Sequence, residues 1–333
     1  MTVRVGINGF GRIGRDYLRC ALDRGIRVAA INDVADPGSL VHLLRRDSTY
    51  GRFERVVHWD NDGELHVDGQ PIALTRHADP ADLDWGRYGV DLVIEATGKF
   101  RSRDDAAVHL KTGPRTVLLS APGKGADVTL VMGVNEAEYD PHAHEVVSAG
   151  SCTTNCVTPM VVVLDEAFGI KAGLMTTVHA YTGDQRLLDS PHSDPRRARS
   201  AAVNIVPTST GAARAVGAVL PEMNGRLDGL ALRVPVPDGS LTDLTVLLDR
   251  VVSASEVNAA FLEAAQGPLT GILQYSTDPI VSTDVIGETA SCLFDAPLTQ
   301  AKDGLVKVFG WYDNEWGYTH RLADLTEHIV QAW

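Results

Sequence analysis

Residues 5 to 15 read Val5-Gly6-Ile7-Asn8-Gly9-Phe10-Gly11-Arg12-Ile13-Gly14-Arg15 and contain the pattern G-x-G-x-x-G. The pattern follows an apolar run over Thr2 to Asn8 that is typical of a strand. It opens a segment, Gly11 to Arg24, in which apolar residues recur at helical spacing. Gly9 and Gly11 permit a tight turn and let backbone N–H groups approach a pyrophosphate at the helix N-terminus. The stretch therefore predicts a doubly wound α/β domain that binds a dinucleotide.

An acidic residue follows at about the distance, roughly 20 residues, that this motif requires. Asp33 stands directly after a second apolar run, Val28 to Asn32. A carboxylate in this place accepts hydrogen bonds from the ribose hydroxyls and repels a 2′-phosphate. We therefore expect NAD rather than NADP as the cofactor, and the alternative interpretation of Asp33 is an ordinary turn aspartate.

A cysteine stands at the start of another predicted helix. The segment Ser148-Ala149-Gly150-Ser151-Cys152-Thr153-Thr154-Asn155-Cys156 joins a strand-like run to an apolar, helix-like run. Unpaired backbone N–H groups and the helix dipole favour the thiolate at such a position. His179 ends a later strand-like run and can serve as the base for this nucleophile. Cys152 and His179 are therefore the candidate catalytic pair for covalent oxidation of an aldehyde, whereas Cys156 is interpreted as a core residue.

The pattern of elements predicts two domains. Strand and helix patterns alternate over the first part of the chain, which indicates a parallel doubly wound sheet. Short hairpins are expected between Phe53 and Arg76, with turns at Asn61-Asp62-Gly63 and Asp68-Gly69. Later strands are longer and helices fewer, as in a mixed or antiparallel sheet. We expect a dinucleotide-binding domain over residues 1–151, completed by a C-terminal helix over about 316–333, and an α+β catalytic domain over 152–315.

The composition argues against several classes of protein. The 333 residues include 30 Lys and Arg and 43 Asp and Glu, a net charge of −13, which does not attract nucleic acid or an anionic membrane. No apolar run is long enough to span a bilayer, and the N-terminus does not resemble a signal peptide. The four cysteines lack the spacing of zinc ligands. Reduced thiols and a cytoplasmic protein are expected.

Local basic residues must therefore hold any anionic substrate. The cluster Arg196-Arg197-Ala198-Arg199, the turn Ser209-Thr210-Gly211 and the strand-end residue Arg233 suit a phosphate, since arginine forks, hydroxyls and glycine N–H groups all bind one. Surface or interface salt bridges explain the loop arginines equally well. For Arg233 we favour the phosphate role.

On these residues the chain resembles the phosphorylating glyceraldehyde-3-phosphate dehydrogenases, in their bacterial NAD-dependent form, over essentially its whole length. Besides residues 5–15, the matching segments are Ala96-Thr97-Gly98, Ser151-Cys152-Thr153-Thr154-Asn155-Cys156, His179-Ala180-Tyr181-Thr182-Gly183-Asp184-Gln185, Pro207-Thr208-Ser209-Thr210-Gly211-Ala212-Ala213, Leu232-Arg233-Val234-Pro235 and Trp311-Tyr312-Asp313-Asn314-Glu315-Trp316-Gly317-Tyr318. The resemblance implies oxidation of D-glyceraldehyde 3-phosphate to 1,3-bisphosphoglycerate in glycolysis or gluconeogenesis. It also implies NAD, inorganic phosphate, a cysteine hemithioacetal and thioester, and a homotetramer.

The resemblance also implies roles for individual residues. The cofactor is expected to contact the backbone N–H groups of Arg12 and Ile13, the ribose-binding Asp33, and Thr97, Ser120, Asn314 and Tyr318. Inorganic phosphate is expected at Ser151, Thr153, Thr210 and Gly211. The substrate phosphate is expected at Thr182, Asp184, Arg233 and one arginine of the loop cluster, for which we choose Arg197.

The chain departs from the family pattern in a few places. Ala149-Gly150 stands where Asn-Ala is usual, Tyr50 stands where His is usual, and Ser190 replaces the Leu of bacterial NAD-using members. Three alternatives follow: an erythrose-4-phosphate dehydrogenase, an inhibitor-resistant isoform of the triose enzyme, and a non-catalytic scaffold that keeps the fold. The phosphate-site motifs favour the triose enzyme.

Overall fold

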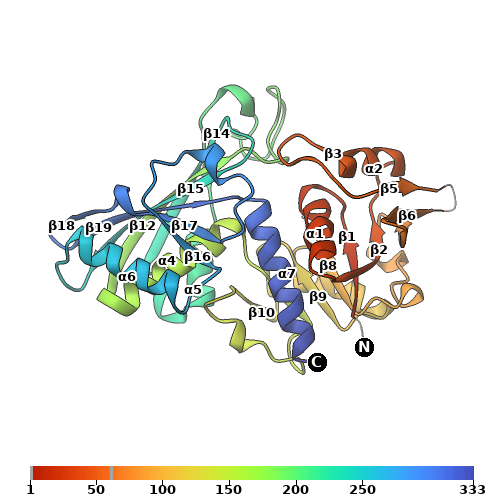
Figure 1. Cartoon of the computed structure of the whole chain (residues 1–333), viewed down its shortest axis with the longest axis horizontal. Helices are drawn as coiled ribbons and strands as arrows, with labels where there is room; N and C mark the ends of the chain where they lie inside the picture. Colours follow the sequence, from red (N-terminus) through yellow and green to blue (C-terminus); the bar gives the residue numbers. More distant parts are fainter. Residues whose placement is uncertain (1–2, 61–62) are drawn as a thin grey trace. The chain divides into compact units, whose positions relative to one another are not determined.

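The computed structural model describes residues 3–60 and 63–333, which form two compact units (Figure 1). Unit 1 comprises Met1–Leu130, Glu136–Gly150 and Thr319–Trp333, and unit 2 comprises Val131–Asn135 and Ser151–Tyr318. Thr2 and two residues of the predicted turn, Asn61 and Asp62, lie outside the described residues. The domain limits given from the sequence remain predictions.

Unit 1 is built on a largely parallel sheet in the order β10-β11-β9-β8-β1-β2-β7-β6-β5. Every pair from β10 to β7 is parallel, and the strands at its centre are buried, as a sheet covered on both faces requires. The strands are β1 (Arg4–Asn8), β2 (Arg27–Asn32), β7 (Gln70–Thr75), β8 (Leu92–Glu95), β9 (Thr116–Leu119), β10 (Val128–Thr129) and β11 (Val146–Ser148). The helices are α1 (Arg12–Asp23), α2 (Pro37–Arg45), α3 (Arg103–Ala106) and most of α7 (Trp316–Gln331). The predicted doubly wound fold is confirmed.

An antiparallel extension follows the second parallel strand. β5 (Val57–Trp59) pairs with β6 (Glu64–Val67), and β6 pairs with β7. Asp68 and Gly69 connect β6 to β7 with φ values of 50° and 79°, the left-handed pair that a tight hairpin turn requires. The hairpin expected at Asp68-Gly69 is therefore confirmed. A separate short pair, β3 (Arg46–Asp47) and β4 (Gly51–Arg52), follows α2.

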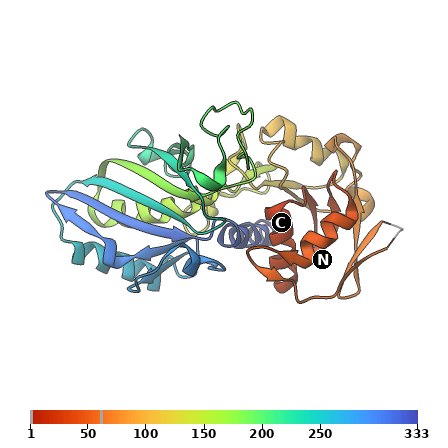
Figure 2. The same cartoon turned by 90° about the horizontal axis from the view of Figure 1, so that it is seen from above.

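Unit 2 is an α+β structure around a mixed sheet in the order β13-β14-β12-β15-β19-β17-β16, with β18 beside β19. The strands are β12 (Ile170–Ala180), β13 (Val206–Ser209), β14 (Leu227–Val234), β15 (Ser240–Leu248), β16 (Leu273–Ser276), β17 (Cys292–Asp295), β18 (Gln300–Lys302) and β19 (Leu305–Tyr312). The helices α4 (Cys152–Phe168), α5 (Ala212–Val219) and α6 (Ala254–Gln266) gather on one face of the sheet, as Figure 1 and Figure 2 show. The predicted mixed sheet is confirmed.

The core of unit 2 lies between α4 and the sheet. Cys156, one turn into α4, is fully buried, in agreement with its interpretation as a core residue, and its sulfur lies 3.5 Å from the Gly310 carbonyl oxygen. A Cβ atom at Gly310 would lie 2.6 Å from Cys292 Sγ and 2.7 Å from Met160 Sδ. Glycine at this point of β19 therefore lets the strand approach α4 closely.

No helix within the described ranges is both long and apolar enough to cross a lipid bilayer.

We expect Gly14→Ala to destabilise unit 1 because a Cβ there would lie 2.1 Å from the Gly9 carbonyl oxygen. Overpacking against backbone costs about 1–3 kcal/mol, so the midpoint of thermal unfolding should fall by several degrees in calorimetry. Gly11→Ala is the matched control, since a Cβ at Gly11 meets nothing within 4 Å. An equal fall in the unfolding midpoint of the two variants would contradict the proposed close contact between Gly14 and the Gly9 carbonyl.

Candidate functional site

The glycines of the first turn have different physical roles. Gly9 has a φ of 93°, and a Cβ there would lie 2.7 Å from the backbone nitrogen of Thr97. Gly14 is needed because α1 passes directly over the Gly9 carbonyl. Gly11 faces open space at the N-terminus of α1, where a phosphate can reach backbone N–H groups such as those of Arg12 and Ile13.

This turn borders a cavity of about 250 Å³ at the carboxyl ends of the parallel strands. Gly9, Gly11, Asp33 and Thr97 line it, together with Asn8, Asn32, Val34, His77, Ala78, Ala96, Lys99 and Phe100. Ser120, which was predicted to line the cofactor groove, is not among the residues around this cavity. Its hydroxyl donates to the Glu95 carbonyl oxygen at 2.9 Å.

Asp33 is both a turn-stabilising residue and a candidate ligand. Its Oδ2 accepts the Phe10 backbone N–H at 2.7 Å, and its Oδ1 accepts the Ala35 backbone N–H at 2.9 Å. Each carboxylate oxygen can accept a further hydrogen bond, so both remain able to bind ribose hydroxyls. The glycine turn, the open N-terminus of α1 and this carboxylate together fit an adenine dinucleotide.

A buried polar network that sequence reasoning missed supports the same cavity. Glu95 accepts hydrogen bonds from Asn8 Nδ2 at 2.6 Å and from the Thr97 backbone N–H at 2.8 Å, and it also bonds the Thr97 hydroxyl. Trp85 Nε1 donates to His109 Nδ1 at 2.9 Å, so His109 Nε2–H faces Glu95 at 3.1 Å. Glu95 thus fixes Thr97, which was expected to contact the cofactor.

In unit 2, Cys152 is the first residue of α4. The Ser151 hydroxyl caps this helix by accepting the Thr154 backbone N–H at 3.1 Å. His179 lies near the carboxyl end of β12, and its Nε2 is 3.4 Å from Cys152 Sγ. The structure therefore brings together the two residues predicted to act as nucleophile and base.

The second nitrogen of His179 defines the state of the ring. His179 Nδ1 lies 2.7 Å from the Ala180 carbonyl oxygen, which can only accept a hydrogen bond. We therefore assign the proton to Nδ1, which leaves the Nε2 lone pair facing the thiol. Arg233 Nη1, 3.0 Å from Nδ1, then donates to the Ala180 oxygen and the Thr182 hydroxyl, each at 3.0 Å.

Burial and the neighbouring positive charge shift the pKa of the Cys152 thiol in opposite directions. Burial, the largest influence, raises the pKa of Cys152 above its usual value, although the Arg233 cation and hydrogen bonds from Thr153 lower it. Burial also lowers the pKa of His179, and Arg233 adds to that effect. These directions favour a neutral thiol beside a neutral imidazole. The thiolate expected from the helix N-terminus stays a prediction, because burial opposes the effects of the helix and of Arg233.

The polar chain continues from His179 to the predicted phosphate residues. Arg233 bonds the hydroxyl of Thr182, which donates to Asp184, and Asp184 pairs with Arg197. Arg197 Nε donates to Thr208 Oγ1 at 2.9 Å. Arg199 instead pairs with Asp189, so the contacts favour Arg197 as the arginine of the loop cluster that joins the site.

Other predicted phosphate residues lie at two helix N-termini. Thr210 Oγ1 accepts the Ala212 backbone N–H at 3.2 Å, and Gly211 is the N-cap of α5. Ser151 is likewise the N-cap of α4. Thr153 differs, because it is buried and its hydroxyl lies 2.8 Å from the Tyr312 hydroxyl.

Asn314 accepts a hydrogen bond from Ser240, a residue that no sequence pattern singled out. The fully buried Ser240 donates its hydroxyl to Asn314 Oδ1 at 2.6 Å and accepts the Ala180 backbone N–H at 3.1 Å. With its oxygen occupied, Asn314 has its Nδ2 group to offer to an acceptor such as a carboxamide oxygen. Tyr318 is buried, and burial raises its pKa well above the usual value, with the Cys152 charge adding to the rise.

Comparison with known proteins places two long parts of the chain in one family. Residues 3–103 match the family model described as glyceraldehyde 3-phosphate dehydrogenase, NAD binding domain, and residues 151–314 match the C-terminal domain of the same family. The chain is 57% identical to glyceraldehyde-3-phosphate dehydrogenase of Streptomyces coelicolor, 54% to that of Geobacillus stearothermophilus and 52% to glyceraldehyde-3-phosphate dehydrogenase 1 of Bacillus subtilis. Each alignment covers 99% of both chains. The chain belongs to the glyceraldehyde-3-phosphate dehydrogenase family, as the motifs predicted.

Proposed function

We propose that this protein oxidises and phosphorylates D-glyceraldehyde 3-phosphate to 1,3-bisphosphoglycerate, with NAD and inorganic phosphate. The observation that carries the proposal is the 3.4 Å contact between Cys152 Sγ and His179 Nε2, continued through Arg233 to Thr182. A nucleophile, a base and a phosphate-binding cation thus lie in one connected group. The names of the relatives favour this reaction, and no observation favours the erythrose 4-phosphate or inhibitor-resistant alternatives.

The proposed reaction begins with the thiol. The Cys152 sulfur attacks the aldehyde carbon while its proton passes to His179 Nε2, and the imidazolium then protonates the new oxyanion to give a hemithioacetal. The Cys152 backbone N–H is a further donor to that oxyanion. His179 next removes the hydroxyl proton as hydride leaves the same carbon, which leaves a thioester on Cys152. Positioned proton transfer of this kind contributes typically about 10²- to 10⁴-fold.

Phosphate completes the proposed cycle. NAD, when bound, would supply the hydride acceptor. In unit 1, Asp33 and the N-terminus of α1 would hold the cofactor, and in unit 2 Asn314 would offer its amide group to the carboxamide. His179 releases its proton to solvent. Inorganic phosphate then attacks the thioester carbon, the C–S bond breaks, and His179 transfers the phosphate proton to the departing sulfur. The acyl phosphate leaves, and the thiol is restored.

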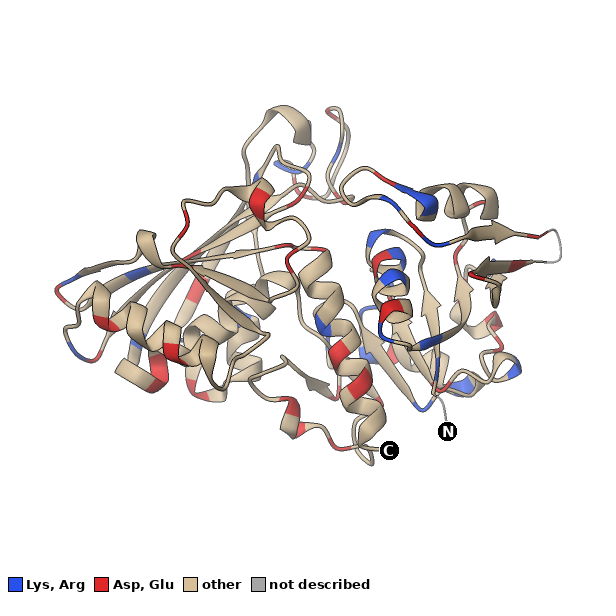
Figure 3. Cartoon of the chain, in the orientation of Figure 1, with Lys and Arg blue, Asp and Glu red and all other residues tan. Residues whose placement is uncertain are grey.

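Anion binding in this protein must be local because the net charge is −13, and acidic residues are spread over both units (Figure 3). Asp184 stays ionised: burial raises its pKa, but the Thr182 hydrogen bond, Arg233 and Arg197 together bring it below the usual value. Arg197 is therefore partly neutralised. Arg233 Nε–H is buried and has no acceptor among the described residues, so we assign Arg233 the larger share of phosphate binding.

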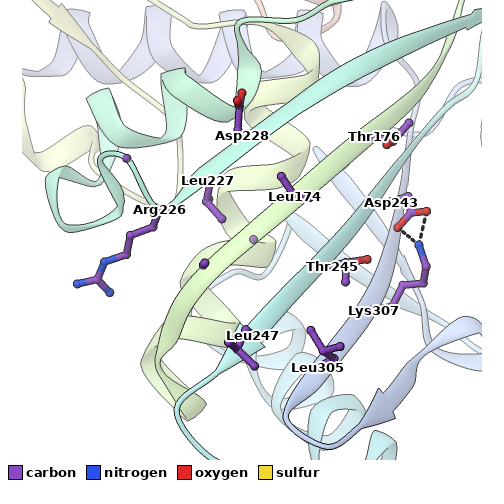
Figure 4. Close-up of a pocket in the computed structure, with 13 residues that line it drawn as sticks. Leu174, Thr176, Arg226, Leu227, Asp228, Asp243, Thr245, Leu247, Leu305 and Lys307 are labelled. Atoms are coloured by element: carbon purple, nitrogen blue, oxygen red, sulfur yellow. Dashed lines mark hydrogen bonds and ion pairs between the residues drawn. The ribbon is translucent and has the colours of Figure 1, made fainter.

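We further propose a homotetramer in the cytoplasm. The face of the unit 2 sheet that turns away from α4 has a pocket of about 620 Å³, lined by exposed Leu174 and Leu305 and by the Lys307–Asp243 ion pair (Figure 4). An open sheet face with exposed leucines suits contact with another copy. Four free cysteines support a reducing compartment. Sedimentation of the purified chain measures the assembly.

We expect Cys152→Ser to abolish turnover while leaving NAD binding intact, because a serine hydroxyl is too weak an acid to replace the thiol. Cys156→Ser is the matched control and should stay active. The assay follows reduction of NAD with glyceraldehyde 3-phosphate, with and without inorganic phosphate, and with erythrose 4-phosphate as the rival substrate. Substantial turnover by pure Cys152→Ser would exclude Cys152 as the nucleophile, and a preference for the erythrose substrate would overturn the proposed function.

We expect Arg233→Lys to raise KM for both the aldehyde and inorganic phosphate, since a lysine cannot reproduce the planar fork. Arg197→Lys should raise mainly the KM for the aldehyde. Steady-state kinetics with each reactant varied separately provide the measurement. If both constants of Arg233→Lys stay within about twofold, or roughly 0.4 kcal/mol, Arg233 has a structural role only.

We expect Ser240→Ala to weaken NAD binding by about tenfold, because the Asn314 amide loses the bond that fixes its orientation, worth roughly 1 kcal/mol or more. Ser291→Ala is the matched control, since Ser291 is also buried but its hydroxyl has no partner among the described residues. Isothermal calorimetry gives the dissociation constants. The proposed role of Ser240 fails if both variants bind NAD as the parent does.

A further inference from the structure

Asp313 connects the turn that carries Asn314 to a separate loop of unit 2. Asp313 directly follows β19 and is 1% exposed. Its Oδ1 accepts the backbone N–H groups of Glu315 at 2.9 Å and Trp316 at 2.6 Å, and its Oδ2 accepts the Gly287 backbone N–H at 2.8 Å. One oxygen of this carboxyl group therefore closes the turn around Asn314, and the other ties that turn to a loop that lies 26 residues away in the sequence.

The loop of residues 281–290 has hydrogen bonds and a buried anchor of its own. It contains a short 3₁₀ helix over Ser282–Val285. The exposed Asp284 accepts the Val281 backbone N–H through Oδ2 at 2.8 Å, and its own backbone N–H donates to the Val281 carbonyl oxygen at 3.0 Å. Val285 is fully buried. The loop therefore has a defined shape, which a support for a neighbouring turn requires.

Two glycines bring the same loop close to the chain on both sides of Asn314. Gly239, which directly precedes the serine that donates to Asn314, has a φ of 81°, and a Cβ there would lie 2.1 Å from the Ser282 carbonyl oxygen. Gly317 follows in α7, and a Cβ there would lie 2.7 Å from the Ala290 carbonyl oxygen. Backbone on either side of Asn314 therefore packs directly against the 281–290 loop.

We propose that Asp313 is a positioning residue that, together with the 281–290 loop, holds the Asn314 amide in place for the nicotinamide carboxamide. The proposal rests on the role proposed for Asn314 in the dehydrogenase reaction. The Ser240 hydroxyl fixes only the side-chain oxygen of Asn314. The bonds to Asp313 fix the backbone from which that side chain extends, so the two sets of contacts together define where the amide nitrogen lies.

A purely structural role for Asp313 predicts a different result. ADP-ribose is the part of NAD that lacks the nicotinamide, and in the proposed site it would contact Asp33 and the N-terminus of α1 but not Asn314. A positioning role therefore weakens the binding of NAD and leaves the binding of ADP-ribose unchanged. General loosening of the fold would affect the two ligands equally.

The test replaces Asp313 by asparagine in the full chain. An amide has the same shape but a single acceptor oxygen, so in either orientation its NH₂ group faces at least one of the three N–H donors. The Kd of NAD should rise by about three- to tenfold, the range expected for one hydrogen bond, while the Kd of ADP-ribose should not change. Calorimetry measures both constants. In steady-state assays kcat should fall at an unchanged KM for the aldehyde, because a displaced nicotinamide is poorly placed to receive hydride.

Three further variants separate positioning from structural support. Asp284→Ala removes only the side-chain bond within the exposed part of the loop, and it should raise the Kd of NAD in the same direction by a smaller factor. In the Asn314→Ala background, Asp313→Asn should add nothing to the Kd of NAD. Asp295→Asn is the matched control: Asp295 is 3% exposed at the end of β17, and its Oδ2 accepts Trp311 Nε1–H at 2.9 Å. It should lower the unfolding temperature without changing the ratio of the two dissociation constants.

Each result decides for or against the proposal. Equal weakening of NAD and ADP-ribose binding in Asp313→Asn would overturn it, as would additive effects of Asp313→Asn and Asn314→Ala, or an unchanged ratio together with an unchanged kcat. If Asp313→Asn does not fold, the ratio measured for Asp284→Ala decides in the same way. Failure of the proposed function is distinguishable, because a shifted ratio in a chain that lacks dehydrogenase activity would leave the positioning role standing and refute only the reaction.

Discussion

The contact between the Cys152 sulfur and His179 depends on where α4 begins and where β12 ends. α4 packs on the sheet of unit 2, and Gly310 lets β19 approach that helix closely. The Ser151 cap fixes the first turn of α4, and Cys152 therefore emerges at a defined point. On the other side, the Ala180 backbone orients His179 through its carbonyl oxygen and bonds Ser240 through its N–H. A small shift of either element would separate the two atoms of this contact.

The same backbone segment links the contact to the proposed ligand sites. The Ala180 carbonyl also accepts from Arg233, and Ser240 also holds Asn314. The backbone of Ala180 thus contacts residues proposed to act in proton transfer, in phosphate binding and in cofactor orientation. Ala180 gave no sign of this in the sequence, because the interactions are made by its backbone.

Local motifs allowed most of the fold to be predicted, and they picked out two residues, Cys152 and His179, that the structure brings together. The glycine turn and Asp33 are close in sequence, so their spacing was enough to predict the nucleotide-binding unit. Cys152 and His179 were recognisable because each lies at the end of a clear helix or strand pattern. Ser240 and Glu95 were missed because their value lies in hydrogen bonds to residues distant along the chain, and a single serine or glutamate has no distinguishing pattern.

Asp33 combines a proposed role in cofactor binding with a structural role in the glycine turn. The sequence argument treated its carboxylate as a selector that accepts ribose hydroxyls and repels a 2′-phosphate. The structure adds that both oxygens hold backbone N–H groups, one of them in the glycine turn itself. Removing the charge would therefore also loosen the backbone that approaches the pyrophosphate. With the role proposed for Asp33, cofactor choice and the shape of the turn are physically coupled through one side chain, so neither can be changed alone by replacing Asp33 with a small apolar residue.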